Sequence, residues 1–157
     1  AYKHKVSIDF FGSINHVLRK VHKKEKIRLF KFDLIYPYNY SLIPENGRVQ
    51  NYFTEKLIDA YLGWSMPIYD GCPNIEKYFP KESYHAINLD NKEESLYQIN
   101  KIIKEPLTKI QIEAIAHARE LILDKYNFWA CLEDIILNQI PQTPWYKKML
   151  FQYTSLN

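Results

Sequence analysis

Short apolar runs and helical repeats alternate along the chain. Four runs have the length and the β-branched or aromatic content of buried strands: Val6–Phe11, Ser41–Ile43, Met66–Tyr69 and Tyr84–Asn88. A basic helical stretch follows the first run, a helix over Thr54–Gly63 is predicted after the second, and a short helix is expected near Asn74. One face of the Thr54–Gly63 helix is expected to hold Leu57, Ala60, Tyr61 and Trp64. This alternation predicts an α/β fold, a Rossmann-like parallel sheet flanked by helices.

Beyond residue 88 the pattern becomes mostly helical. Three helices are predicted: Lys92–Ile103, Thr108–Asp124 and Tyr126–Asn138. Apolar residues recur on one side of the first and third helices, which predicts core packing; they are Leu96, Ile99 and Ile103, and Phe128, Leu132 and Ile136. Pro141 and Pro144 then interrupt the helical pattern. The aromatic and basic segment Trp145–Tyr153 is expected to cover the core; the alternative is an exposed association site.

The turn between the Ser41–Ile43 strand and the Thr54–Gly63 helix concentrates polar chemistry. In α/β folds nucleotides bind at the carboxyl ends of strands, and the start of a helix favours a phosphate through its N–H groups and dipole. Lys56 adds a full positive charge there, and Glu55 suits the dipole or accepts hydrogen bonds from ribose hydroxyls. The alternative is that Thr54 caps the helix and both charged side chains are solvated.

A series of ordered motifs surrounds this turn. Between Tyr38 and Phe79 the chain carries Glu-Asn, Tyr-x-Thr-Glu-Lys-Leu, Ala-Tyr-Leu, Met-Pro-Ile-Tyr and Asn-Ile-x-x-Tyr-Phe-Pro, in that order. Together these motifs resemble the donor-binding domain of the α-1,3-fucosyltransferases. The resemblance is strong over the middle third of the chain, and it extends weakly to Val6–Phe11 and to Asn127-Phe128.

The resemblance implies a GT-B glycosyltransferase with two Rossmann-like domains. It also implies an inverting transfer of fucose from GDP-fucose to a glycan hydroxyl, with the donor held mainly by the C-terminal domain and with no metal or other cofactor. By position, it assigns Lys56 to the diphosphate, Glu55 and Asn46 to the ribose, and Tyr52 to the wall of the nucleotide pocket. Glu45 shares the motif and is expected to have a supporting or sugar-side role.

The chain departs from the family pattern in two motifs and in extent. Pro44-Glu45-Asn46 stands where the family usually has Phe-Glu-Asn, and Asp70 stands where an aromatic or aliphatic residue often follows Pro-Ile-Tyr. The resemblance places the acceptor domain, its glutamate general base and an arginine for the diphosphate N-terminal to residue 1. Residues 1–157 are therefore expected to form one donor-binding domain without a catalytic residue of its own, which binds GDP-fucose but does not transfer it alone.

Composition agrees with one folded domain. The 157 residues are 46% hydrophobic, which suits a single sizeable core, and no run approaches the roughly 18 uninterrupted apolar residues of a membrane span. No signal peptide is visible. Cys72 and Cys131 are isolated and lack metal-ligand spacing, so two reduced thiols and a cytoplasmic location are expected.

Charge is uneven along the chain. Residues 1–31 carry nine Lys or Arg against two acidic residues, although the net charge of the whole chain is only +3. Most of these cations fall in residues 16–31, where a solvated helix face is expected. Alternatively this segment attracts a nucleotide sugar, an acidic glycan or an anionic membrane surface. Nucleic acid is disfavoured, because no helix-turn-helix, ribonucleoprotein or zinc-finger pattern accompanies the charge.

Other catalytic patterns are absent from the sequence. The five histidines lack ligand spacing, and there is no Gly-x-Ser-x-Gly elbow, Walker loop, Gly-x-Gly-x-x-Gly fingerprint or Asp-x-Asp pair, so no metal site is predicted. Gly12 and Gly71 each follow a predicted strand, as pocket backbone or as ordinary turns. Two other functions stay open: a relative that uses another nucleotide sugar, and a noncatalytic binding or scaffold module. A Lys-, Ile-, Asn- and Tyr-rich composition favours a bacterial enzyme that decorates a surface glycan.

Overall fold

The structure is a computed structural model that describes residues 34–139. It divides into two compact units, Ala1–Arg119 and Glu120–Asn157, and each is described by itself. Several sequence predictions lie outside the described residues: the strand Val6–Phe11 with Gly12, the basic stretch 16–31 and the segment Trp145–Tyr153.

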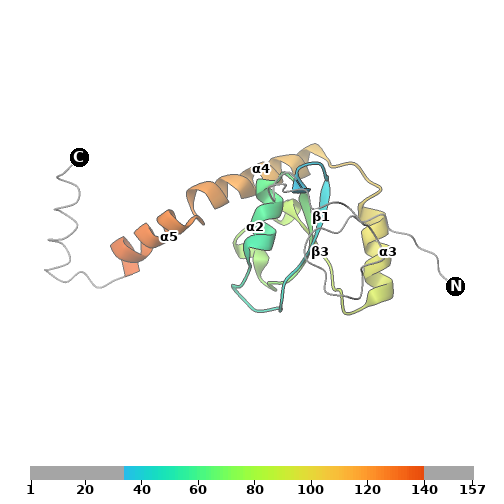
Figure 1. Cartoon of the computed structure of the whole chain (residues 1–157), viewed down its shortest axis with the longest axis horizontal. Coiled ribbons are helices and arrows are strands. Elements are labelled where there is room, and N and C mark those ends of the chain that lie inside the picture. The colour runs from blue at the N-terminus through green and yellow to red at the C-terminus, as the bar shows by residue number, and fades with distance from the viewer. Residues whose placement is uncertain (1–33, 140–157) are drawn as a thin grey trace, which may run out of the picture. The chain divides into compact units, whose positions relative to one another are not determined.

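The first unit contains a three-stranded parallel sheet in the order β1-β2-β3. Its strands are β1 (Tyr40–Pro44), β2 (Met66–Asp70) and β3 (His85–Ala86). All five residues of β2 are buried, as expected for the central strand of a parallel sheet that is covered on both faces. Figure 1 shows α2 and α3 on opposite sides of the sheet. The predicted α/β, Rossmann-like fold class is confirmed.

Helix α2 (Glu55–Leu62) connects β1 to β2 and packs on both strands. The buried face predicted from helical spacing is largely observed; its members are Leu57, Ala60 and Tyr61. Tyr61 is the largest fully buried side chain of the described residues. Its ring packs on Phe79 with the centroids 5.0 Å apart, and its hydroxyl shares a 2.8 Å hydrogen bond with the hydroxyl of buried Ser83. Burial raises the pKa of the Tyr61 phenol.

Trp64 does not belong to this face, so that part of the prediction is wrong. It follows Gly63, which caps the end of α2, and adopts a left-handed φ of 61° with the side chain exposed. The guanidinium of Arg119 lies 4.5 Å from the centroid of the Trp64 ring. The same guanidinium donates hydrogen bonds to the main-chain oxygens of Tyr61 and Leu62, where the carboxyl end of α2 favours a cation.

The chain between β2 and α3 contains less regular secondary structure than predicted. Two 3-10 turns, Ile75–Lys77 and Lys81–Ser83, lead from β2 to β3, and the first lies where a short helix was expected. β3 has two residues, whereas the predicted strand covered Tyr84–Asn88. Helix α3 (Lys92–Ile102) follows and places Ile99 in the core, as predicted.

Helix α4 (Lys109–Asp124) begins with a capping box. The Thr108 hydroxyl accepts the Gln111 N–H at 3.3 Å, and the Gln111 side-chain oxygen accepts the Thr108 N–H at 2.9 Å. This bonding pattern explains why the helix starts directly after Thr108, close to the predicted boundary. Within the first unit, α4 buries Ala114, Ile115 and Ala118.

The second unit contains the end of α4, helix α5 (Phe128–Asp134) and a π-helical turn (Ile135–Gln139). Asn127 caps α5 by accepting a first-turn N–H at 2.9 Å. No residue of α5, which is described throughout, is buried; Phe128 is 69% exposed and its ring packs edge-on against Trp129. The predicted core packing of Phe128 is therefore wrong, because helical periodicity identifies an apolar face but not what covers it.

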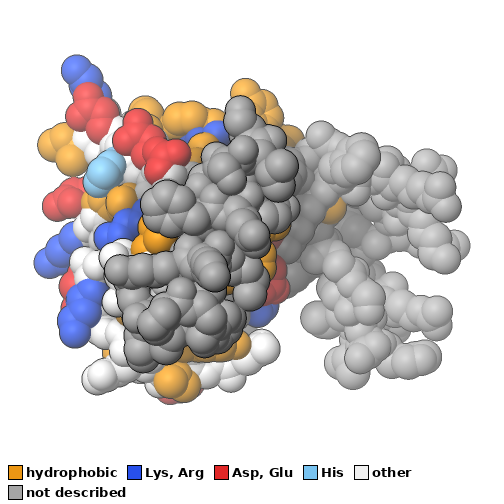
Figure 2. All heavy atoms as spheres, turned by 90° about the vertical axis from the view of Figure 1, so that its left-hand side faces the viewer, with side chains coloured by type: hydrophobic (Ala, Val, Ile, Leu, Met, Phe, Trp, Pro, Cys, Tyr) orange, Lys and Arg blue, Asp and Glu red, His pale blue; other side chains and the backbone are white. Residues whose placement is uncertain are grey.

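The cysteines, the helices and the surface charges can be compared with what the composition predicts. Both cysteines are free, as predicted: Cys72 is buried and Cys131 is exposed. Among the described residues, no helix has the length and apolar character needed to cross a bilayer. On the face shown in Figure 2, acidic and basic side chains of the described residues are interspersed rather than segregated by sign.

Candidate functional site

The carboxyl ends of the three strands lie at one edge of the sheet, because the strands are parallel. Pro44, Asp70 and Ala86 end the strands, and a polar segment follows each of them. The first segment, Glu45–Thr54, leads to the start of α2 and is called the edge loop below. Its first N–H, on Glu45, donates to the main-chain oxygen of Asp70 at 2.8 Å. This edge of a parallel α/β sheet is where ligands bind.

The Glu45 carboxylate is the buried centre of the edge loop. Its side chain is 0% exposed, and Thr54 satisfies both oxygens: the backbone N–H donates to Oε1 at 2.8 Å and the hydroxyl donates to Oε2 at 2.7 Å. The Lys56 ammonium lies 3.5 Å from Oε2. A buried carboxylate needs such partners, since an uncompensated one is strongly destabilising. The structure thus gives Glu45 a supporting place beneath Lys56.

Lys56 lies in the first turn of α2, where the helix dipole alone disfavours a cation. Glu45 supplies an anion for it within the chain, so the position of the lysine does not by itself require a ligand. The lysine side chain is only partly enclosed by these contacts, however. Its Nζ lies 3.3 Å from the Thr54 hydroxyl oxygen and 4.0 Å from the carboxylate of Glu55, and 33% of the side chain is exposed. The predicted Thr54 cap is confirmed, with the hydroxyl oxygen accepting the Lys56 N–H at 3.3 Å.

The other three predicted site residues are exposed around this pair. Asn46 follows Glu45 at the carboxyl end of β1, Tyr52 lies near the end of the edge loop, and Glu55 begins α2. The structure therefore brings the five predicted residues to one edge of the sheet. Their roles toward a nucleotide remain predictions.

Arg48 is a central residue of this edge that the sequence did not single out. Its Nε and Nη2 donate to the two carboxylate oxygens of Asp70 at 2.5 and 2.6 Å, and its Nη1 donates to Asp90 at 2.5 Å. Nη2 also donates to the side-chain oxygen of Asn88 at 2.8 Å. Hydrogen bonds from Arg48, and from the Leu89 N–H, lower the pKa of the Asp70 carboxyl, and those to Asp70 and Asp90 raise the pKa of Arg48. One side chain thus ties the edge loop to the ends of β2 and β3.

Asn51 fixes the far part of the edge loop. It has a left-handed φ of 61°, in a turn closed by the Tyr52 N–H donating to the Val49 oxygen at 3.3 Å, and asparagine tolerates this conformation better than most residues. Its side-chain oxygen accepts hydrogen bonds from Asn74 and from the Tyr78 hydroxyl, both at 2.7 Å. Its N–H donates to the Asn74 side chain at 2.9 Å. Sequence reasoning also missed this anchor.

Gly71 lies where the end of β2 approaches the buried carboxylate. A Cβ atom at this position would lie 2.6 Å from Cγ of Glu45 and 2.5 Å from Cζ of Tyr69. The Tyr69 hydroxyl accepts the Cys72 N–H at 2.9 Å, and burial, with a contribution from Glu45, raises its pKa to about 12. The glycine predicted from the strand ending is thus required by close packing.

Three carboxylates of this edge are engaged by protein groups, whereas the Glu55 side chain is 66% exposed. Glu45 bonds to Thr54, and Asp70 and Asp90 bond to Arg48. Across residues 34–139, no group of three or more His, Cys, Asp or Glu side chains is placed to hold a metal ion. The groups that this edge offers to a ligand are therefore the Lys56 ammonium, the start of α2 and exposed polar side chains.

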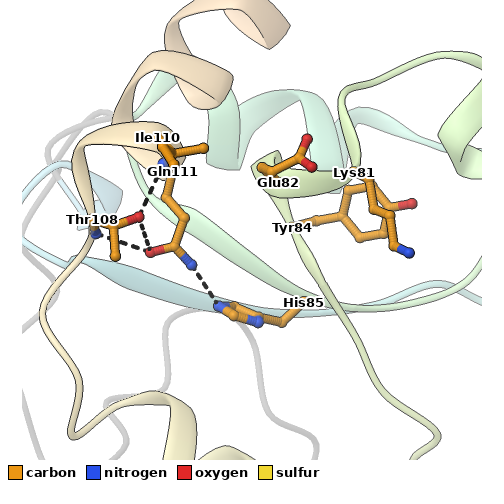
Figure 3. A pocket seen from close by; sticks show the side chains of 7 residues that line it. All are labelled: Lys81, Glu82, Tyr84, His85, Thr108, Ile110 and Gln111. Atoms are coloured by element: carbon orange, nitrogen blue, oxygen red, sulfur yellow. Dashed lines mark hydrogen bonds between the residues drawn. The ribbon is translucent and has the colours of Figure 1, made fainter.

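A hollow of about 460 Å³ lies at the opposite, amino edge of the sheet (Figure 3). It is lined by Lys81, Glu82, Tyr84, His85, Thr108, Ile110 and Gln111. The side-chain nitrogen of Gln111 lies 3.2 Å from Nε2 of His85, and because an amide nitrogen only donates, this ring nitrogen carries no proton. Burial lowers the pKa of His85, which agrees with a neutral ring. No predicted site residue lines this hollow.

The comparisons with known proteins follow the same region. The family description "Glycosyltransferase family 10 (fucosyltransferase) C-term" matches residues 1–108, which include the edge loop, the three strands, α2 and α3. The chain is similar to an alpha-(1,3)-fucosyltransferase, FucT, of Helicobacter pylori, with 36% identity over 67 residues; the match covers 42% of this chain and 14% of that protein.

It is also similar to a putative fucosyltransferase-like protein of Arabidopsis thaliana, with 30% identity over 78 residues that cover 50% of this chain and 14% of that protein. The chain thus spans only a small part of the length of these relatives. No solved structure matches it. Because the family match covers well over half of the chain, the chain belongs to glycosyltransferase family 10, the fucosyltransferases, and carries the C-terminal region of that family.

Proposed function

We propose that this chain is the donor-binding part of an inverting, GT-B-type fucosyltransferase that transfers fucose from GDP-fucose to a glycan hydroxyl. The nucleotide binds at the carboxyl edge of the sheet, across the edge loop and the start of α2. Family membership supports the reaction class, and the α-1,3-fucosyltransferase among the relatives supports fucose as the sugar that is transferred.

One observation carries the location of the donor. The Lys56 ammonium is held at the start of α2 by the buried Glu45 carboxylate, and a third of its side chain faces solvent. An anchored ammonium beside the first N–H groups of a helix provides both a full charge and aligned donors for a diphosphate. Because Glu45 and Thr54 already fix its position, Lys56 loses little further freedom when a phosphate binds.

The remaining predicted residues then surround the nucleoside. Asn46 and Glu55 accept hydrogen bonds from ribose hydroxyls, and the Tyr52 ring, which is 41% exposed, covers one side of the nucleotide. Exposed side chains in the unliganded protein are available for these contacts without breaking internal bonds.

The chemistry proposed for this part of the enzyme is electrostatic. When an acceptor oxygen attacks the anomeric carbon, the bond from that carbon to the β-phosphate oxygen breaks, and GDP leaves with additional negative charge. Lys56 and the start of α2 stabilise this charge more strongly in the transition state than in the bound donor, and such a difference accelerates the reaction. In the proposal the general base is outside this chain.

The proposal includes no metal ion, because Lys56 and the helix start are assigned the role of neutralising the diphosphate. Affinity for GDP is accordingly expected to be the same in EDTA and in millimolar Mg²⁺. An affinity that appears only with the cation would contradict this assignment.

The experiment that tests the proposal is calorimetric titration of this chain with GDP-fucose, GDP, UDP and ADP. GDP-fucose and GDP are expected to bind, and Lys56→Ala to weaken GDP by at least about tenfold through loss of a charge-assisted hydrogen bond. Lys92→Ala is the matched control, because Lys92 is an exposed lysine in the first turn of α3. Thermal unfolding of each variant separates lost binding from lost folding.

The outcomes separate the competing functions. Preference for UDP or ADP would mean that the domain takes another nucleotide sugar. No binding of any nucleotide, or GDP binding that Lys56→Ala leaves unchanged, would favour a noncatalytic module and would contradict the proposed site.

A further inference from the structure

The edge loop is fixed at every third residue. Glu45, Arg48, Asn51 and Thr54 all make the hydrogen bonds described above, to partners in the loop itself or after β2 and β3. Between these anchors Asn46, Val49, Gln50 and Tyr52 are exposed, whereas the Phe53 ring packs against Tyr78 and Phe79. The loop thus presents exposed side chains from a backbone that hydrogen bonds hold in place.

Among the anchors, Arg48 bonds to the partner that is most distant in the sequence, Asp90. The guanidinium is bidentate to Asp70, which is buried at the end of β2, and its remaining nitrogen reaches Asp90, whose side chain is 74% exposed. Asp70 is held in turn by the Leu89 N–H at 3.0 Å. Asp70 is therefore the fixed partner of this cluster, and Asp90 is a partner at its rim.

We propose that Arg48 is a positioning residue for the nucleotide. Through its two hydrogen bonds to Asp70, Arg48 fixes the edge loop so that Asn46 and Tyr52 are already in place when the nucleotide binds. The inference rests on the function proposed above, and it assigns a role to Asp70, one of the two positions at which the motifs of this chain depart from the family pattern.

The geometry favours this indirect role over a contact with phosphate. All three nitrogens of the Arg48 guanidinium are engaged, at 2.5 to 2.8 Å, by two carboxylates and an amide. A fixed loop, in contrast, raises affinity because less conformational freedom is lost when the ligand binds.

A lysine cannot replace Arg48 in this arrangement. The planar guanidinium presents two parallel N–H groups to one carboxylate, whereas an ammonium is a point charge on a flexible stem. Arg48→Lys therefore keeps the charge of the cluster and removes its geometry. Asp70→Asn tests the same contact from the other side, and Asp90→Asn, which alters only the exposed partner, is the matched control.

The test measures affinities of wild-type chain and variants for both GDP and GMP. Positioning of Asn46 and Tyr52 affects the nucleoside, which the two ligands share. Arg48→Lys and Asp70→Asn are therefore expected to weaken GDP and GMP by the same factor, about tenfold, while Asp90→Asn stays within about twofold of wild type. Lys56→Ala, in contrast, is expected to weaken GDP more than GMP.

Two results would overturn the inference. If Arg48→Lys weakens GDP much more than GMP, Arg48 contacts the β-phosphate directly. If Arg48→Lys and Asp70→Asn bind both ligands as wild type does, the contact has no positioning role.

A separate measurement keeps this inference distinct from the proposed function. If wild-type chain binds no guanine nucleotide, the proposed function fails, and amide hydrogen exchange of the unliganded protein decides the structural part. Arg48→Lys is expected to speed exchange at residues 46–53 while leaving α4 unchanged. Equal exchange in variant and wild type would show that Arg48 does not fix the edge loop.

Discussion

Gly71 shows how little space separates the end of β2 from the buried Glu45 carboxylate. An added methyl group would overlap Cγ of Glu45 and the buried Tyr69 ring, and neither can move away without breaking hydrogen bonds. The backbone at the end of β2 therefore limits where the Glu45 side chain can lie. Because Glu45 contacts Lys56, it also limits the position of Lys56 on α2.

Gly71→Ala is expected to lower the free energy of unfolding by about 1–3 kcal/mol, the usual cost of overpacking. It is also expected to weaken GDP binding, because Glu45 moves and Lys56 with it. Gly47→Ala is the control, since a Cβ there would meet only the Val49 side chain, at 4.0 Å. Chemical denaturation measures both variants, and equal stability of the two would contradict the close contact at residue 71.

At the scale of single residues, the sequence revealed those that belong to a contiguous motif. Lys56 was identified from its place at the start of a predicted helix, and Glu45 because it shares the motif on which the family resemblance rests. Arg48 and Asn51 were missed because their partners Asp70 and Asn74 lie 22 and 23 residues away, on segments brought close only by β1–β2 pairing. An aspartate that ends a fully buried strand was the available signal, since such a charge requires a partner.

At the scale of elements, the start of α2 does two things at once. Thr54 caps the helix by accepting the Lys56 N–H, and the same hydroxyl donates to the Glu45 carboxylate. The cap is thus also one of the groups that make a buried carboxylate tolerable. Asn91, the cap of α3, accepts the Glu94 N–H at 3.2 Å, and within residues 34–139 its side chain does not bond to a buried carboxylate.

The comparison of these two caps gives a prediction. Asn91→Ala is expected to cost about 1 kcal/mol, the value of a cap alone. Thr54→Ala is expected to cost about 2–3 kcal/mol, because it also removes a hydrogen bond to a charged group. Thr54→Ser keeps the hydroxyl and should lie close to wild type. Denaturant unfolding measures all three, and similar costs at residues 54 and 91 would contradict the coupling of the cap to Glu45.

Helices with caps were predicted well, and elements defined by distant contacts were not. α2 and α4 begin where Thr54 and Thr108 cap them, which is local information. β3 ends early because the chain turns after Ile87. The Asn88 side chain accepts a bond from the Asp90 N–H, in a local turn that the apolar pattern did not indicate, and one from Arg48, which is distant in the sequence. The exposed face of α5 could not be distinguished from a core face by periodicity.

At the scale of the whole molecule, two of the described groups, His85 and Asp70, link stability to acid. The pKa of His85 is lowered by burial, so the neutral ring stabilises the fold and this contribution declines as pH falls below 6.5. The pKa of Asp70 is lowered chiefly by Arg48, so its contribution is present above pH 3.8 and is lost as pH falls through the folded-state pKa. The two groups therefore act in separate pH ranges.

A comparison of the wild-type chain with Asp70→Asn isolates the contribution of Asp70, because His85 is present in both proteins. The variant is expected to be less stable than wild type at neutral pH, with a difference that shrinks as pH falls below 3.8. Unfolding by urea across this range measures the difference. A gap that stays constant down to the most acidic pH would contradict the charge pairing of Arg48 and Asp70.

The nucleotide is proposed to bind at the carboxyl edge of the sheet. The carboxyl edge carries the family motif, the anchored Lys56 and the edge loop, whereas the amino edge carries an open hollow around His85 and Gln111. The two edges are formed by different segments of the chain, so a bound nucleotide can be located by its effect on each segment.

The most direct test is amide chemical-shift mapping of GDP on isotopically labelled chain. We expect saturable shifts at Asn46, Tyr52, Glu55 and Lys56, and none at Lys81–His85 or Thr108–Gln111. Shifts confined to the two segments that line the hollow, with the edge loop unaffected, would contradict the proposed binding site.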